Sequence, residues 1–125
     1  YLSAAMASNP NIRNPGYNTL RDLFSEEYGL LDKINYVRGI LNTYNRVYPQ
    51  LYDVDLRLDH PRLQVPVYFF EGRYDLNAPV DLVVSYAETL EAPAKEIVWF
   101  EHSGHNPWIN ESDRFVRELL QRAPR

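Results

Sequence analysis

The chain has 125 residues, of which 45% are hydrophobic and 24% charged, and its formal net charge is −4. This length and composition are typical of one folded, globular domain. The small negative charge, without any basic run, argues against a nucleic-acid partner. No apolar stretch approaches the ~20 residues that span a bilayer, and the absence of cysteine excludes disulfides and thiolate catalysis.

The chain begins at Tyr1, without an initiator methionine or a signal-peptide pattern. This favours a piece of a longer chain or a processed product in which targeting information is missing. The compartment therefore stays open, with the cytoplasm as the default.

The first part of the chain is expected to hold turns and then helices. Turn-forming residues dominate positions 7–18 and predict an irregular connection. Asn18 or Thr19 can cap a short helix that runs to about Tyr28 and ends at Gly29.

A longer helix should follow, because apolar residues recur at steps of three and four. These positions are Leu30, Leu31, Ile34, Val37, Leu41, Tyr44 and Tyr48. Pro49 should end this helix, and residues 49–64 are expected to be mostly loop.

The second half of the chain reads as strand, helix, strand, helix. Val65–Glu71 and Lys95–Glu101 are short apolar or β-branched runs, and the first suits a strand buried on both faces. This alternation predicts a parallel βαβ unit. Since two parallel strands do not make a stable sheet alone, further chain or a partner should cover them.

Two helices complete this half. Pro79 can lie in the first turn of the helix between the strands, after Asn77 or Ala78 as its cap, and Pro93 should close that segment. The last helix should open at Asn110, with three apolar side chains turned inward. These are Phe115, Leu119 and Leu120.

Two motifs follow the strands, Gly72-Arg73-Tyr74-Asp75 and Ser103-Gly104-His105. Catalytic groups gather at the carboxyl ends of parallel strands. Asp75 could accept a hydrogen bond from His105 and orient it as a general base. Each residue also has a simpler reading: Asp75 as a turn aspartate that binds its own backbone, and His105 as a structural histidine.

Other candidates for the site are weaker. His102 belongs to a strand end and His60 to a polar loop, and no histidine pair has the helical spacing of a zinc site. No Gly-x-Ser-x-Gly occurs. Ser103 lacks the turn that exposes a nucleophilic serine, and Ser85 falls in mid-helix.

The segment Val65–Leu120 resembles the C-terminal end of the α/β-hydrolases. Residues 65–75, with Pro79 beyond them, are similar to the acid-bearing strand and turn of that family. Residues 101–105 are similar to its histidine loop and residues 110–120 to its closing helix. Gly-Arg-Tyr-Asp and Ser-Gly-His are most similar to the proline-iminopeptidase-like branch.

The resemblance implies an α/β fold class, the C-terminal portion of an α/β-hydrolase fold. Residues 1–60 would be the end of a helical cap region and residues 61–125 a parallel βαβα part of the core. Asp75 and His105 would be the acid and the histidine of a catalytic triad. Its serine would lie upstream of Tyr1, and no metal or organic cofactor would be needed.

The full enzyme would then cleave a small ester, amide or N-terminal peptide bond through an acyl-enzyme. Relatives with an aspartate nucleophile cleave epoxides or carbon–halogen bonds on the same frame. In a third reading the chain is a non-catalytic module that docks on a partner chain, on the missing N-terminal half or on a second copy.

Side chains of the cap region are candidates for substrate contact. Cap carboxylates hold the substrate amine in the iminopeptidase-like branch, which points to Glu26 and Glu27, although adjacent glutamates usually only face solvent. Five tyrosines could line a pocket or pack between helices. They are Tyr28, Tyr36, Tyr44, Tyr48 and Tyr52.

Overall fold

The structure, a computed structural model, describes residues 2–14 and 23–123. The chain divides into two compact units. One unit is formed by residues 1–16 together with 60–125, and the other by residues 17–59. None of the described helices has the length and apolarity that crossing a membrane requires.

The division into units differs at the N-terminus from the one that the sequence suggests. Residues 1–60 were expected together in the cap region, whereas residues 1–16 pack with the second half of the chain. The peptide N–H of Arg13, for example, donates to the carbonyl of His102 at 2.9 Å. This segment begins with the helix α1 (Leu2–Ala7), and residues 8–14 form the turns and bends that were expected after it.

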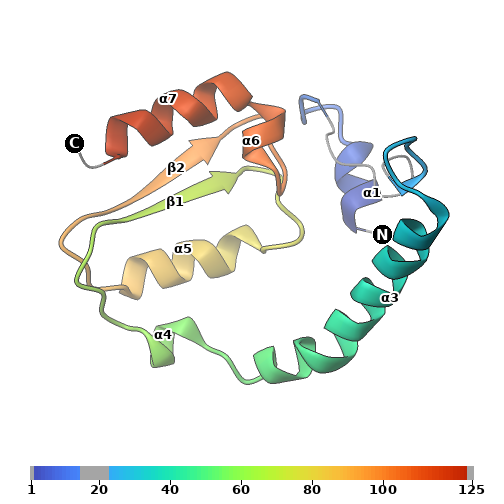
Figure 1. The fold of residues 1–125 in the computed structure, drawn as a ribbon. Coiled ribbons are helices and arrows are strands. Elements are labelled where there is room, and N and C mark those ends of the chain that lie inside the picture. The colour runs from blue at the N-terminus through green and yellow to red at the C-terminus, as the bar shows by residue number, and fades with distance from the viewer. Residues whose placement is uncertain (1, 15–22, 124–125) are drawn as a thin grey trace. The chain divides into compact units, whose positions relative to one another are not determined.

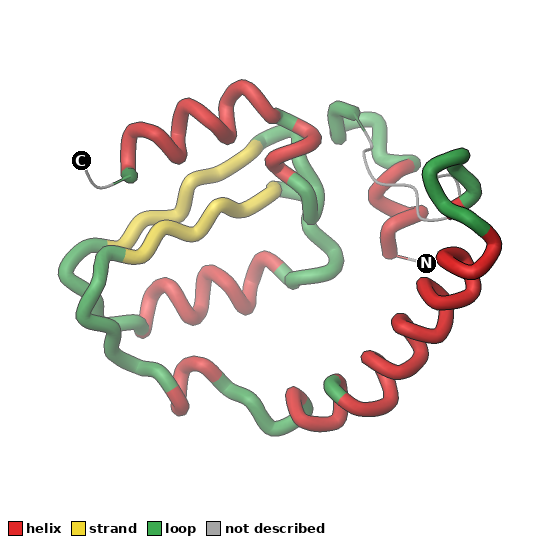
Figure 2. The backbone as a smooth tube through the Cα atoms, viewed as in Figure 1, coloured by secondary structure: helices red, strands yellow, loops and turns green. Residues whose placement is uncertain are grey.

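The first unit is built on a parallel pair of strands, β1 (Val67–Gly72) and β2 (Lys95–Phe100), joined through α5 (Val80–Thr89) (Figure 1). The tube in Figure 2 shows the two strands side by side, with the connecting helix along one face of the pair. This confirms the predicted parallel βαβ unit. The register pairs Val67 with Lys95 and continues to the pairing of Gly72 with Phe100. β1 starts later than expected because Pro66 has no N–H to give to the ladder.

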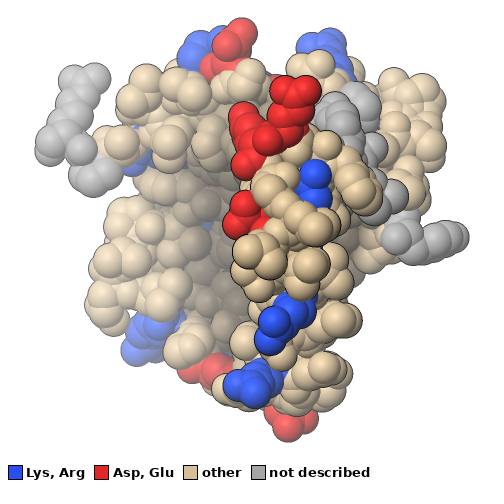
Figure 3. Space-filling model, turned by 45° about the vertical axis from the view of Figure 1, so that its right-hand side comes forward, with Lys and Arg blue, Asp and Glu red and all other residues tan. Residues whose placement is uncertain are grey.

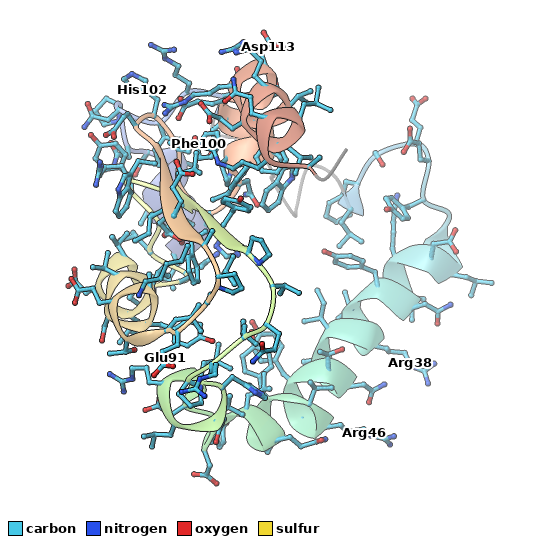
Figure 4. All side chains as sticks on the ribbon, turned by 90° about the vertical axis from the view of Figure 1, so that its left-hand side faces the viewer. Arg38, Arg46, Glu91, Phe100, His102 and Asp113 are labelled. Atoms are coloured by element: carbon cyan, nitrogen blue, oxygen red, sulfur yellow. The ribbon has the colours of Figure 1, made fainter. Side chains whose placement is uncertain are left out.

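Helices cover both faces of these strands, α5 on one and α7 (Ser112–Arg122) on the other (Figure 1). Successive strand residues point to opposite faces. Phe69 therefore meets Tyr86 of α5, with ring centroids 5.9 Å apart, whereas Phe70 meets Phe115 of α7 at 5.2 Å. Phe100 is fully buried and lies on the strand beneath α7 (Figure 4).

The C-terminal helix is interrupted where a single helix from Asn110 was expected. A short helix, α6 (Pro107–Asn110), ends at Glu111, whose φ of −134° is not helical, and α7 begins at the next residue. Phe115 packs inward as expected. Leu119 and Leu120 do not, since they are 49% and 70% exposed.

The start of α5 also differs from the expectation. Pro79 immediately precedes the helix, and neither Asn77 nor Ala78 caps it with a side chain. Their peptide N–H groups instead donate to the carboxylate of Asp75. The helix ends at Thr89, and the capping residue Leu90 that follows is almost fully buried, shortly before Pro93.

The second unit contains α3 (Leu30–Arg46), the 3₁₀ helix η1 (Tyr48–Leu51) and α4 (Leu56–Asp59). The long helix is confirmed, although it ends before Tyr48. Pro49 lies in the first turn of η1, where a missing N–H costs nothing. η1 and α4 replace part of the loop expected over residues 49–64.

The short helix expected before Gly29 is not formed in its C-terminal half. Its start at Asn18 or Thr19 lies outside the described residues, and residues 24–28 form turns and bends. Gly29 precedes α3 instead of ending a helix. Its N–H donates to the Asp32 carboxylate at 3.0 Å, which satisfies a free donor at the start of α3.

Much apolar surface of the first unit is left open beside β1. A groove of about 800 Å³ runs along this strand and α7. It is lined by Val65, Pro66, Tyr68, Phe70, Phe115, Leu119, Arg122 and Ala123. In the described part of the chain the sheet has only two strands, so each strand keeps one unpaired edge. On the face drawn in Figure 3, uncharged side chains predominate and the basic ones lie in small separate groups.

Candidate active site

The structure brings Asp75 and His105 together from the loops that follow the two strands. The distance between Asp75 Oδ2 and His105 Nδ1 is 2.8 Å. Asp75 is 8% exposed, whereas the His105 side chain is 43% exposed. The contact expected from the motif spacing is thereby confirmed. It joins a buried carboxylate to a ring that can meet a ligand.

Asp75 is held from its other side by the backbone. Its Oδ1 accepts the N–H of Asn77 at 2.7 Å and that of Ala78 at 3.1 Å. Asp75 therefore binds its own turn, as in the simpler reading, and binds His105 as well. Because an ionised carboxylate only accepts hydrogen bonds, Nδ1 of His105 is the donor. This leaves the lone pair on Nε2, so the ring is arranged as a base at its outer nitrogen.

The two loops are tied to each other by peptide hydrogen bonds. The N–H of Tyr74 donates to the carbonyl of Ser103 at 3.0 Å, and the N–H of Arg73 donates to that of Phe100 at 3.0 Å. The Arg73 guanidinium also lies over the Trp99 ring, 3.9 Å from its centroid. These main-chain contacts hold the beginnings of the two loops against each other.

The alternative residues near this site are engaged elsewhere. Ser103 is fully buried, and its hydroxyl donates to Glu111 Oε2 at 2.7 Å, so its oxygen does not face an incoming substrate. The His102 ring lies 3.3 Å from the carbonyl of Asn11. His60 is exposed, and its carbonyl accepts the Tyr86 hydroxyl.

Sequence reasoning missed one ionisable group, Glu71, which is only 7% exposed. Its Oε1 is buried without a hydrogen-bond partner among the described residues. Burial, and next the charge of Asp75, raise the pKa of Glu71 to about 7, while the charge of His105 acts in the opposite direction. The available signal was a charged residue at the end of an otherwise apolar strand.

The structure also places the other candidates that the sequence offered. No group of three or more histidine or acidic side chains in the described residues is placed to bind a metal ion. Glu26 and Glu27 of the second unit are exposed, and Tyr44 stacks on Tyr48 with ring centroids 4.4 Å apart.

Known proteins with similar sequences are hydrolases by name. The probable aminopeptidase YbaC of Bacillus subtilis is 31% identical over 101 residues, which are 81% of this chain and 32% of that protein. The pimeloyl-[acyl-carrier protein] methyl ester esterase of Vibrio atlanticus is 36% identical over 73 residues, 58% of this chain and 28% of the esterase. No protein-family profile matches the chain.

A solved structure is similar in fold. An alpha/beta fold family hydrolase from Bacillus anthracis matches with a TM-score of 0.53 and 17% identity, over 96% of this chain and 54% of that protein. The chain spans about a third of the length of the curated relatives that it matches. Together with the parallel β1–α5–β2 arrangement, these similarities show that the chain belongs to the α/β-hydrolases and carries a C-terminal part of their fold.

Proposed function

We propose that this chain supplies the acid and the general base of a serine hydrolase. The observation that carries the proposal is the 2.8 Å contact between Asp75 and His105 at the carboxyl ends of two parallel strands. A buried carboxylate that orients an exposed imidazole is the arrangement that activates a hydroxyl nucleophile. The resemblance of both motifs to the family pattern supports the same roles.

In the proposed reaction the serine comes from sequence outside residues 1–125. His105 Nε2 takes the hydroxyl proton while the serine oxygen attacks the substrate carbonyl, and Asp75 stabilises the imidazolium. The imidazolium then gives its proton to the alcohol or amine as this group departs. The acyl part of the substrate stays bound to the serine as an ester. A water molecule, deprotonated in the same way, releases the acid and the free serine.

The proposed substrates are small esters, amides or N-terminal peptide bonds. One relative is named an aminopeptidase and another a methyl ester esterase, so both leaving groups are represented among similar proteins. The unit of residues 17–59 would be the end of a helical cap, and Glu26 or Glu27 could bind a substrate amine there. The proline-iminopeptidase-like branch is the specific affiliation that we propose.

The test uses the full natural protein that contains this chain. A fluorophosphonate probe should inhibit its hydrolysis of p-nitrophenyl acetate and of amino-acid p-nitroanilides, and mass spectrometry should place the adduct on a serine outside residues 1–125. The chain of residues 1–125 alone should show no turnover above that of free imidazole.

Three results would overturn the proposal. Turnover by residues 1–125 alone that is abolished in Ser103→Ala would place the nucleophile within the histidine loop. Turnover of epoxides or alkyl halides without any fluorophosphonate adduct would indicate an aspartate nucleophile instead. A full protein that binds its partners but hydrolyses none of these substrates would favour the docking module.

A further inference from the structure

The loop that carries His105 is held by Asn110, the last residue of α6, and by Glu111, which separates α6 from α7. Glu111 Oε2 accepts the peptide N–H of His102 at 2.8 Å and the hydroxyl of Ser103 at 2.7 Å. The amide oxygen of Asn110 accepts the N–H of Gly104 at 3.1 Å. Three consecutive loop residues immediately before the imidazole are therefore held by side chains.

These hydrogen bonds are formed away from water. Ser103 is fully buried, Asn110 is 5% exposed and the Glu111 side chain is 7% exposed. Buried hydrogen bonds to a charged group are stronger than exposed ones, and a partner left unpaired there is unfavourable. The other carboxylate oxygen of Glu111 lies 3.5 Å from Arg114 Nη1, which balances its charge.

Asn110 has a second set of partners on the N-terminal segment. Its Nδ2 donates to the carbonyl of Arg13 at 3.0 Å and to that of Asn14 at 2.6 Å. Asn14 has a φ of 44°, in the left-handed region that asparagine tolerates, and the two carbonyls converge on one amide group. One buried side chain thus joins the histidine loop to residues 13 and 14.

We propose that Asn110 and Glu111 are positioning residues, which hold the backbone of residues 102–104 and thereby set where the His105 ring meets Asp75. The proposal rests on the proposed function, because the group that these residues orient is the His105 ring, the proposed general base. The hydrogen bonds of both side chains go to the loop and the N-terminal segment, whereas the ring itself bonds to Asp75, so both residues act through the loop. A displacement of a catalytic group by about 1 Å can cost on the order of 100-fold in rate.

The test compares five variants in the full natural protein. Asn110→Ala and Glu111→Ala remove the loop contacts, whereas Glu111→Gln keeps an oxygen that can accept them. Leu90→Ala is the matched control, because it destabilises the unit from a buried position at the end of α5 without touching the loop. Asp113→Asn, an exposed change at the start of α7 (Figure 4), controls for charge.

Two measurements are made on each variant at a temperature well below its unfolding midpoint. The first is the NMR signal of the hydrogen-bonded His105 Nδ1–H in protein labelled with ¹⁵N-histidine, and the second is the pair kcat and KM. We expect Asn110→Ala and Glu111→Ala to lose or broaden the signal. We expect their kcat to fall by roughly 10- to 100-fold while KM changes by less than about threefold. Glu111→Gln and both controls should keep the signal and most of kcat.

The proposal is overturned if the two alanine variants keep the Nδ1–H signal and kcat, or if Leu90→Ala loses them to the same extent. The NMR signal is read without any substrate, so it tests the positioning even if the proposed function fails. Full turnover in Asp75→Asn would reject the proposed function but would not reject the positioning of the loop.

Discussion

Gly72, the last residue of β1, lies directly against the backbone of Gly104 in the histidine loop. A Cβ atom added to Gly72 would come within 2.7 Å of the carbonyl oxygen of Ser103 and closer still to that of Gly104. Real Cβ atoms do not approach a backbone oxygen so closely, and no flexible side chain is there to move aside. The approach of the two loops therefore depends on the absence of a side chain.

Gly72→Ala should separate the two loops. We expect a loss of about 1–3 kcal/mol in the free energy of unfolding, since overpacking a tight contact has a cost of this order. The hydrogen bond between Asp75 and His105 should weaken with it. Urea unfolding and the His105 Nδ1–H signal measure the two effects.

The matched control for this change is Gly39→Ala in the middle of α3. An added Cβ there meets nothing within 4 Å. Replacing a glycine inside a helix by alanine should stabilise the protein by roughly 0.5–1 kcal/mol. Equal effects of the two substitutions would contradict the importance of the contact between Gly72 and Gly104.

Asp75→Asn tests the acid. An asparagine can still accept the N–H groups of Asn77 and Ala78, but an amide NH₂ turned toward His105 would face a donor. The ring would then have to present the lone pair at Nδ1 and lose its base at Nε2. We expect kcat of the full protein to fall on the order of 10⁴-fold. The exposed Asp81→Asn in α5 should leave kcat within about twofold.

His105→Ala should reduce turnover of the full protein at least as strongly as Asp75→Asn does, because it removes the base itself. His60→Ala and His102→Ala are its matched controls and should retain most of the activity. If His102→Ala instead proved as damaging as His105→Ala under the same assay, the assignment of the base would be wrong.

Glu71 predicts a dependence of stability on pH. Its pKa is raised from 4.5 to about 7 in the folded chain, so between these pH values the folded state binds more protons at this group than the unfolded state does. Stability should therefore fall as the pH rises through this window, and the loss should be complete above about pH 7.

Glu71→Gln removes this ionisation. At pH 8 the variant should be more stable than the parent chain by roughly 1–3 kcal/mol, and near pH 4 the difference should vanish. Urea unfolding across pH 4–8 measures it, with the exposed Glu88→Gln as control. Parallel pH profiles for the parent and Glu71→Gln would show that this carboxylate is not penalised by burial.

The open groove beside β1 predicts association of the isolated chain. An unpaired strand edge next to exposed apolar side chains favours pairing with another chain. Light scattering on residues 1–125 alone should show species larger than a monomer. Leu119→Lys, in the groove, should reduce their mass more than Leu82→Lys on α5. A monodisperse monomer with cooperative unfolding is the contrary result.

The sequence predicted those features that local pattern determines. The two apolar runs predicted β1 and β2, and the acid and histidine that follow them predicted the contact between Asp75 and His105. The pairing of Asn110 with Arg13 and Asn14 was not predictable. Its single amide bonds to residues that lie 97 and 96 positions earlier in the chain. The break at Glu111 was missed for a similar reason. Its neighbours in sequence favour a continuous helix, whereas its carboxylate bonds to the distant loop residues His102 and Ser103.

The parallel course of β1 and β2 separates two kinds of loop. Asp75 and His105 lie at one end of the strands, while the connection through Ala92 and Pro93 from α5 into β2 lies at the other. A change in the length of that connection leaves the register of the site untouched. In homologous proteins this is where insertions and deletions should accumulate. It is also the place for an inserted affinity tag or fluorophore that must not disturb the base.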